Sequence, residues 1–112
     1  MEYRYKIYKE VYSDMLSGKK TIEFRLLNDK SEKITKGDII NFIVEDDESL
    51  FLETKVIDKY IYDNLEELWN SKNVLNNCLD YNKEEFIEAF YNIFGKEQVD
   101  NTKIVGFKIK VI

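Results

Sequence analysis

SGKKTIEFRLLNDK, residues 17–30, alternates apolar and polar side chains in the way that a β-strand does. One face of this strand carries Ile22, Phe24 and Leu26. The opposite face carries Thr21, Glu23 and Arg25. A solvated strand in a sheet has this pattern, and so does a strand that presents a binding site. The sequence leaves both interpretations of the polar face open.

The polar residues of this strand form a chemically coherent set. Lys20 follows the turn at Ser17-Gly18, where a bend of the backbone can aim its amine over the polar face. Arg25 is suited to hold a phosphate or carbonyl oxygen through paired N–H groups, and Glu23 to accept from an exocyclic amine. The alternative is that Glu23 and Arg25 pair with each other on an exposed sheet, which contributes roughly a few tenths of a kcal/mol.

Length and composition predict one globular domain spanning residues 1–112, because 44% of the residues are hydrophobic and 35% are charged. No apolar run approaches the roughly 20 residues that cross a bilayer, and the N-terminus lacks the apolar region of a secretion signal. The lone Cys78 cannot form an internal disulfide, which favours a reducing compartment. We therefore expect a cytoplasmic protein without a membrane partner.

The absence of histidine excludes His-dependent catalysis and His-ligated zinc, and a single cysteine excludes a thiolate metal cluster. We therefore predict no metal and no cofactor. Any catalysis must use Lys, Asp, Glu, Thr, Ser, Tyr or the single Cys.

The net charge of −5 is unevenly distributed. Residues 1–36 carry nine Lys/Arg against six Asp/Glu, whereas residues 37–112 carry eight against sixteen. A basic N-terminal third on an acidic body can hold an anionic ligand locally while the rest repels it. Chance clustering of charges is the alternative.

The other elements follow from periodicity and end signals. Strands are predicted over 3–8 and 103–112, and a hairpin over 38–62 with a charged turn at 45–49. A helix ends at Gly18, and two more begin at Asn64 and Asn82, each with Glu three residues on. Residues 27–36 are predicted to be a polar loop. Phe86, Ala89, Phe90 and Ile93 form the predicted buried stripe of the last helix. This order predicts an α+β fold, a small β-barrel of mostly antiparallel strands with flanking helices.

Two runs, SGKKTIEFR (residues 17–25) and ITKGDIINF (residues 34–42), together resemble the hallmark of the ASCH domain, a family of the PUA-like superfamily. The matching positions are Lys19, Lys20, Thr21, Ile22, Glu23, Phe24, Arg25, Gly37 and Asp38. The resemblance implies a PUA-like barrel with flanking helices and a cleft lined by the hallmark residues. It also implies a module that binds RNA or a nucleotide-like ligand.

One branch of this family resembles an amidohydrolase that deacetylates N4-acetylcytidine with a Lys, a Thr and a Glu. The Lys falls on Lys20, but Glu23 stands where that branch has its Thr, and a carboxylate cannot replace a hydroxyl nucleophile without changing the mechanism. The nearest match for the acid is Asp80. A metal-free amidohydrolase that uses Lys20 and Glu23 is therefore the alternative function, and whether the protein is an enzyme stays open.

The predicted ligand-binding set combines the strand with two further residues. Gly37-Asp38 could place a carboxylate at the cleft, although shaping the loop is the more ordinary role. Tyr62 closes a strand that could pass the cleft mouth, where an aromatic ring can stack on a base. The full set is Lys19, Lys20, Thr21, Glu23, Arg25, Asp38 and Tyr62. RNA or a nucleotide-like small molecule is the expected partner.

Overall fold

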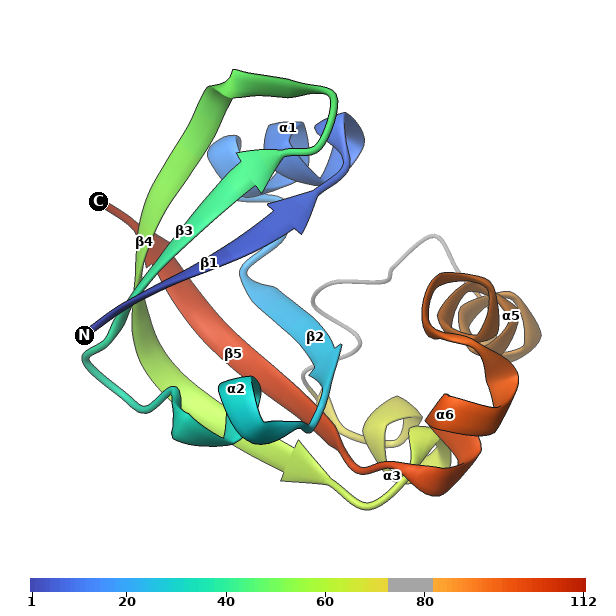
Figure 1. Ribbon diagram of the computed structural model, residues 1–112. Helices are drawn as coiled ribbons and strands as arrows, with labels where there is room; N and C mark the ends of the chain where they lie inside the picture. The colour runs from blue at the N-terminus through green and yellow to red at the C-terminus, as the bar shows by residue number, and fades with distance from the viewer. Residues whose placement is uncertain (73–81) are drawn as a thin grey trace.

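The computed structural model describes residues 1–72 and 82–112 and contains one curled five-stranded sheet with helices around it (Figure 1). α1 lies at one end of the sheet, and α3, α5 and α6 gather beside β2 and the other end of the sheet (Figure 1). In chain order the elements are β1 (Glu2–Ile7), α1 (Lys9–Leu16), β2 (Ile22–Leu26), α2 (Asp29–Lys33), β3 (Ile39–Val44), β4 (Asp47–Tyr62), α3 (Leu65–Trp69), α5 (Lys83–Phe94), α6 (Lys96–Asn101) and β5 (Ile104–Val111).

The sheet has the strand order β1-β3-β4-β5-β2. β3 and β4 form the predicted antiparallel hairpin, and β5 pairs antiparallel with both β4 and β2. β1 alone pairs in parallel, with β3. The register shifts between Ile43 and Val44 and between Val56 and Asp58, and bulges of this kind bend a sheet. The sheet is therefore mostly antiparallel and strongly curved.

The curvature does not close the sheet, so the predicted barrel is a half-barrel. β1 and β2 are its two edges, since within residues 1–72 and 82–112 β1 pairs only with β3 and β2 only with β5. Side chains cross the gap between these edges in place of a strand ladder. Arg25 Nη2 donates to the Lys6 carbonyl at 2.9 Å, and the Lys30 ammonium donates to the Arg4 carbonyl. Closure was mispredicted because alternation reveals a curved sheet but not the width of its opening.

β2 is covered on both faces. Ile22 and Phe24 belong to a core cluster with α3, α5 and α6. Glu23 lies opposite Phe107 and Arg25 opposite Val105 in the antiparallel register, and paired residues share a face. Phe107 and Val105 belong to the other core cluster, which fills the inside of the curled sheet. The polar face of β2 therefore points toward the protein interior and is not a solvated sheet surface.

The predicted helix starts are confirmed, and two short helices were missed. Asn64 accepts from the Glu67 amide, and Asn82 and Glu85 form a reciprocal capping box. α2 lies in the segment predicted as a loop, where Asn28 caps the Ser31 amide. α6 begins directly after Gly95, which ends α5 with a φ of 89°. Both missed helices are too short for their periodicity to be recognised.

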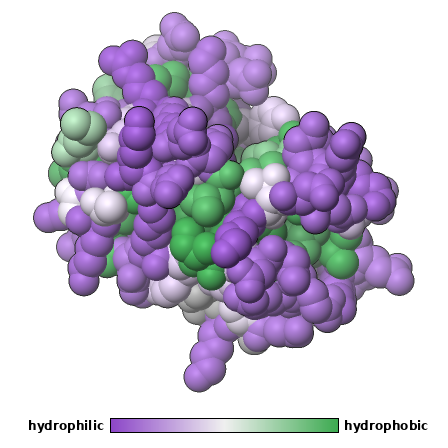
Figure 2. All heavy atoms as spheres, turned by 60° about the horizontal axis from the view of Figure 1, so that its bottom comes forward, coloured by the Kyte–Doolittle hydropathy of each residue, from purple (hydrophilic) through white to green (hydrophobic). Residues whose placement is uncertain are grey.

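Polar side chains cover most of the molecular face in Figure 2, and apolar side chains reach this surface in a strip between two polar regions. None of the helices described in residues 1–72 and 82–112 is long and apolar enough to cross a membrane.

Tyr5 packs against the core cluster inside the curled sheet. Its ring stacks on Phe42 with centroids 6.3 Å apart, and the Arg25 guanidinium lies 4.4 Å from its centre. Its hydroxyl is buried without a hydrogen-bond partner among the described residues. An unsatisfied buried hydroxyl costs about 1 kcal/mol or more, so the Tyr5 hydroxyl lowers the free energy of unfolding.

Tyr5→Phe should therefore raise the free energy of unfolding by about 1 kcal/mol at neutral pH. Burial, reinforced by Glu23 and opposed by Arg25, raises the pKa of Tyr5 above its usual 10.0. The folded protein then keeps the phenol proton where the unfolded chain loses it, so wild-type stability falls as pH rises past 10. Tyr5→Phe should lack this contribution. Urea unfolding at neutral and alkaline pH measures both effects, and a less stable variant at neutral pH would contradict the account.

Candidate functional site

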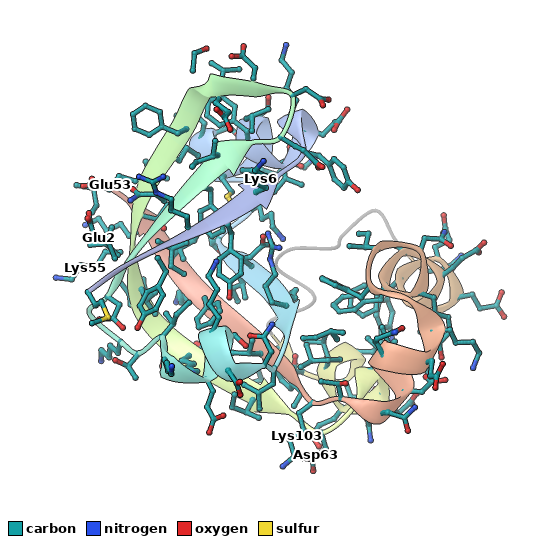
Figure 3. All side chains as sticks on the ribbon, in the orientation of Figure 1. Glu2, Lys6, Glu53, Lys55, Asp63 and Lys103 are labelled. Atoms are coloured by element: carbon teal, nitrogen blue, oxygen red, sulfur yellow. The ribbon has the colours of Figure 1, made fainter. Side chains whose placement is uncertain are left out.

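A cleft of about 530 Å³ opens beside β2, within the size range of small-molecule sites. The end of β1, α1 and the start of the β3–β4 turn also contribute to it. Its lining separates by chemistry. The charged lining residues are Lys6, Asp14, Lys20, Glu23, Arg25 and Glu45. The apolar ones include Phe24 and five residues of α5, namely Phe86, Ala89, Phe90, Ile93 and Phe94. Figure 3 shows Lys6 on β1. The cleft thus joins an ionic side to an apolar side.

Glu23 is the central charged group of the cleft and is only 7% exposed. Its Oε2 accepts from Arg25 Nη2 at 2.9 Å and from Arg25 Nε at 3.3 Å. Its Oε1 lies 3.5 Å from Lys20 Nζ. A carboxylate is retained in such a place only when it is paired and hydrogen-bonded. The two cations therefore fix the position of the Glu23 side chain at the cleft.

The turn before β2 positions Lys20. Gly18 follows α1 with a φ of 81°, a backbone conformation that favours glycine. The Lys20 amide then donates to the Asp14 carbonyl at 2.9 Å, which ties the chain back to α1. The Lys20 amine lies 5.7 Å from the centre of the Phe24 ring. The turn therefore places the amine beside β2, 3.5 Å from Glu23 Oε1 and over the Phe24 ring.

Arg25 is occupied by contacts within the protein. Besides Glu23, it bonds the Lys6 carbonyl and stacks on Tyr5. Lys30 also lies over the Tyr5 ring, and burial, with Arg25 as a second cause, lowers the pKa of Lys30. Arg25 thus orients Glu23 and connects the two edges of the sheet. Its direct contact with a ligand stays a prediction.

The backbone of β2 adds hydrogen-bonding groups to the cleft. The Ile109 amide donates to the Thr21 carbonyl at 2.9 Å, and the Leu27 amide to the Lys103 carbonyl at 2.8 Å. Hydrogen-bonded pairs alternate in an antiparallel ladder, so the N–H and C=O of Phe24 point away from β5. Phe24 is also one of the residues that line the cleft. The free edge of β2 therefore carries a peptide donor and a peptide acceptor at Phe24.

Of the predicted set, Lys20, Glu23 and Arg25 come together in the cleft, and the other four residues lie elsewhere. Thr21 lines a smaller pocket of about 300 Å³ between the end of α1 and β5, which Lys20 also borders. Lys19 is exposed and lines neither pocket.

Asp38 and Tyr62 have structural positions away from the cleft. Asp38 accepts from the Thr35 amide at 2.9 Å and from the N-terminal ammonium at 3.3 Å. The hydrogen bond from the Thr35 amide is the main cause of the lowered pKa of Asp38. Tyr62 is 6% exposed and packs edge to face with Phe24 in the core. Asp80, the predicted third member of the catalytic alternative, lies outside the described residues.

Several cleft residues had no recognisable signal in the sequence. Asp14, Glu45 and Tyr8 come from separate elements, and only the fold brings them together. Ile93 was predicted to be buried, but it is 57% exposed. Helical periodicity identifies a face but cannot say whether core or cleft covers it.

No family model matches this sequence, and no curated protein does. Solved structures match over nearly the whole chain. The crystal structure of hypothetical protein PH0355 is 26% identical with a TM-score of 0.84, and each chain is covered completely. Protein PF0455 from Pyrococcus furiosus is 23% identical with a TM-score of 0.75, covering 100% of this chain and 98% of that one.

The crystal structure of an ASCH domain from Lactobacillus crispatus is 14% identical with a TM-score of 0.68, and the match covers 98% of this chain and 79% of that one. At this identity the match shows the fold alone. The protein therefore has an ASCH-like fold, in agreement with the resemblance of its β2 motif.

Proposed function

We propose that this protein is a binding module that takes an unpaired base of RNA, or a nucleotide-like small molecule, in the cleft beside β2. The observation that carries the proposal is the buried Glu23 carboxylate, fixed by Lys20 and Arg25 at the cleft. A fixed carboxylate accepts hydrogen bonds from the amine edge of a base. The Phe24 peptide adds a donor and an acceptor at the free edge of β2, and the apolar residues of α5 suit the faces of a ring.

The charges around the cleft favour a compact ligand over a long nucleic acid. Three basic residues (Lys6, Lys20 and Arg25) and three acidic ones (Asp14, Glu23 and Glu45) line it. The whole chain carries a net charge of −5. Affinity for a duplex grows with the number of phosphates neutralised, and a balanced cleft on an acidic protein neutralises few.

Titration with labelled single-stranded RNA, the matching duplex and a panel of nucleotides, each at 50 and 200 mM salt, tests this proposal. We expect saturable binding of the single strand, with an affinity that falls less than about tenfold between the two salt concentrations. By comparison, a protein that contacts 6–10 phosphates loses about a thousandfold or more in affinity over this range. Duplex binding should be weaker. Absence of saturable binding to every probe, or steep salt dependence with preference for the duplex, would contradict the proposal.

Hydrolysis of an amide on an acylated nucleoside is the second candidate. It is favoured by the 3.5 Å separation of the Lys20 amine and the Glu23 carboxylate at the cleft, since such pairs can transfer protons. The Thr21 hydroxyl is not part of this arrangement, because Thr21 borders the smaller pocket and not the cleft. Incubation with N4-acetylcytidine should give turnover that Lys20→Ala abolishes. Turnover that survives this substitution would remove Lys20 from the mechanism.

A further inference from the structure

Two large apolar side chains of the cleft are exposed. Tyr8 is 55% exposed and Ile93 is 57% exposed, and both line the same cleft as Glu23. Single exposed apolar residues are common on protein surfaces. Two of them lining one concave site are the pattern expected of a ligand-contacting surface.

Ile93 continues a helix face that begins in the core. Phe86 and Phe90 of α5 are 3% and 7% exposed and pack in the cluster that contains Phe24. Ile93 lies three residues after Phe90, on the same face of the helix. Phe94 packs on Phe90 at the partly buried margin of this cluster, whereas Ile93 is exposed on the cleft, so the apolar stripe extends beyond the buried core.

Tyr8 is presented from a fixed backbone. It stands between β1 and α1, where its carbonyl accepts from the Tyr12 amide at 3.0 Å as α1 begins. The preceding carbonyl, of Ile7, accepts from the Glu45 amide at 2.9 Å. The Tyr8 side chain makes no capping bond to α1. Its ring is thus not required for the local structure, although its position is well defined.

We propose that Tyr8 and Ile93 form the contact surface for the planar heteroaromatic ring of the ligand, with Tyr8 as the stacking residue. This inference rests on the proposed function, because it assumes that the cleft receives a base. The ring faces would contact Tyr8 and the end of the α5 stripe, while the polar edge of the ring would reach Glu23. Tyrosine suits this role because its ring is apolar and its hydroxyl tolerates water.

The test compares affinities for one labelled single-stranded RNA among full-length variants. Because Tyr8→Ala removes the ring on which the base stacks, it should bind the RNA at least about fivefold more weakly than wild type. Tyr8→Phe should bind within about twofold of wild type, since it keeps the ring, and Ile93→Ser should also bind more weakly. Phe51→Ala is the matched control, because Phe51 is 59% exposed and does not line the cleft. It should bind like wild type.

Ribose 5-phosphate, which lacks a base, provides a second readout and should not compete with the RNA. Three results would overturn this inference while leaving the proposed function standing. They are wild-type affinity in Tyr8→Ala, a loss of affinity in Phe51→Ala equal to that in Tyr8→Ala, and competition by ribose 5-phosphate. A wild-type protein that binds none of the RNA or nucleotide probes would overturn the proposed function, and this inference with it.

Discussion

Glu23→Gln is expected to weaken binding of single-stranded RNA by at least about tenfold, the loss that corresponds to one hydrogen bond to a charged group. The substitution keeps the size of the side chain, which is 9% exposed, and removes its charge. A neutral amide is a weaker acceptor for the ligand, and it leaves the Lys20 and Arg25 charges beside the cleft without their carboxylate partner.

Glu53→Gln is the matched control for this substitution. Glu53 is exposed on β4, on the side of the sheet away from α5 (Figure 3), and it does not line the cleft. It should bind RNA like wild type. Affinities are measured by titration at a temperature where urea unfolding shows each variant to be folded. Equal affinity in Glu23→Gln and wild type would exclude the carboxylate from recognition.

Arg25→Ala is expected to lower the free energy of unfolding by about 2–4 kcal/mol, within the range for breaking a largely buried ion pair. The side chain of Arg25 is 22% exposed, and that of Glu23 is 9% exposed. Among the described residues, removal of the Arg25 side chain leaves Glu23 with the longer contact to Lys20 and takes the Arg25 donor away from the Lys6 carbonyl. The contact between the edges of the sheet is weakened at the same time.

Two further variants separate these effects in denaturant unfolding. Lys108→Ala removes an exposed cation from the neighbouring strand β5 and should change stability by less than about 0.5 kcal/mol. Arg25→Lys should recover only part of the loss, because an ammonium cannot reproduce the planar fork that contacts Glu23 and Tyr5 together. A loss below about 1 kcal/mol in Arg25→Ala would show that Arg25 does not connect β1 and β2.

Local signals in the sequence predicted most of the fold. Alternation identified β2 and the β3–β4 hairpin, and the pairs Asn64 with Glu67 and Asn82 with Glu85 marked helix starts correctly. Such features act over a few residues, so the sequence states them directly. The opening between β1 and β2 depends on contacts between residues about twenty apart, such as Arg25 with Lys6. Local patterns do not report such contacts.

The site was predictable in part for the same reason. Lys20, Glu23 and Arg25 share one short strand with its preceding turn, so their proximity follows from strand geometry. The burial of Glu23 does not, because it depends on the curl of the sheet, which turns the polar face of β2 toward the core cluster of Val105 and Phe107. Ile93 shows the converse. It is an apolar residue that helical periodicity assigns to the core and that the fold leaves beside the cleft.

Amide chemical-shift mapping during the RNA titration tests most directly whether the cleft beside β2 is the ligand site. We expect the largest shift changes on the amides of Lys20 and Phe24 and on α5 around Ile93. Changes that gather on the far side of the sheet around Glu53 and Lys55 (Figure 3), with the amides of the cleft unperturbed at saturation, would contradict this assignment.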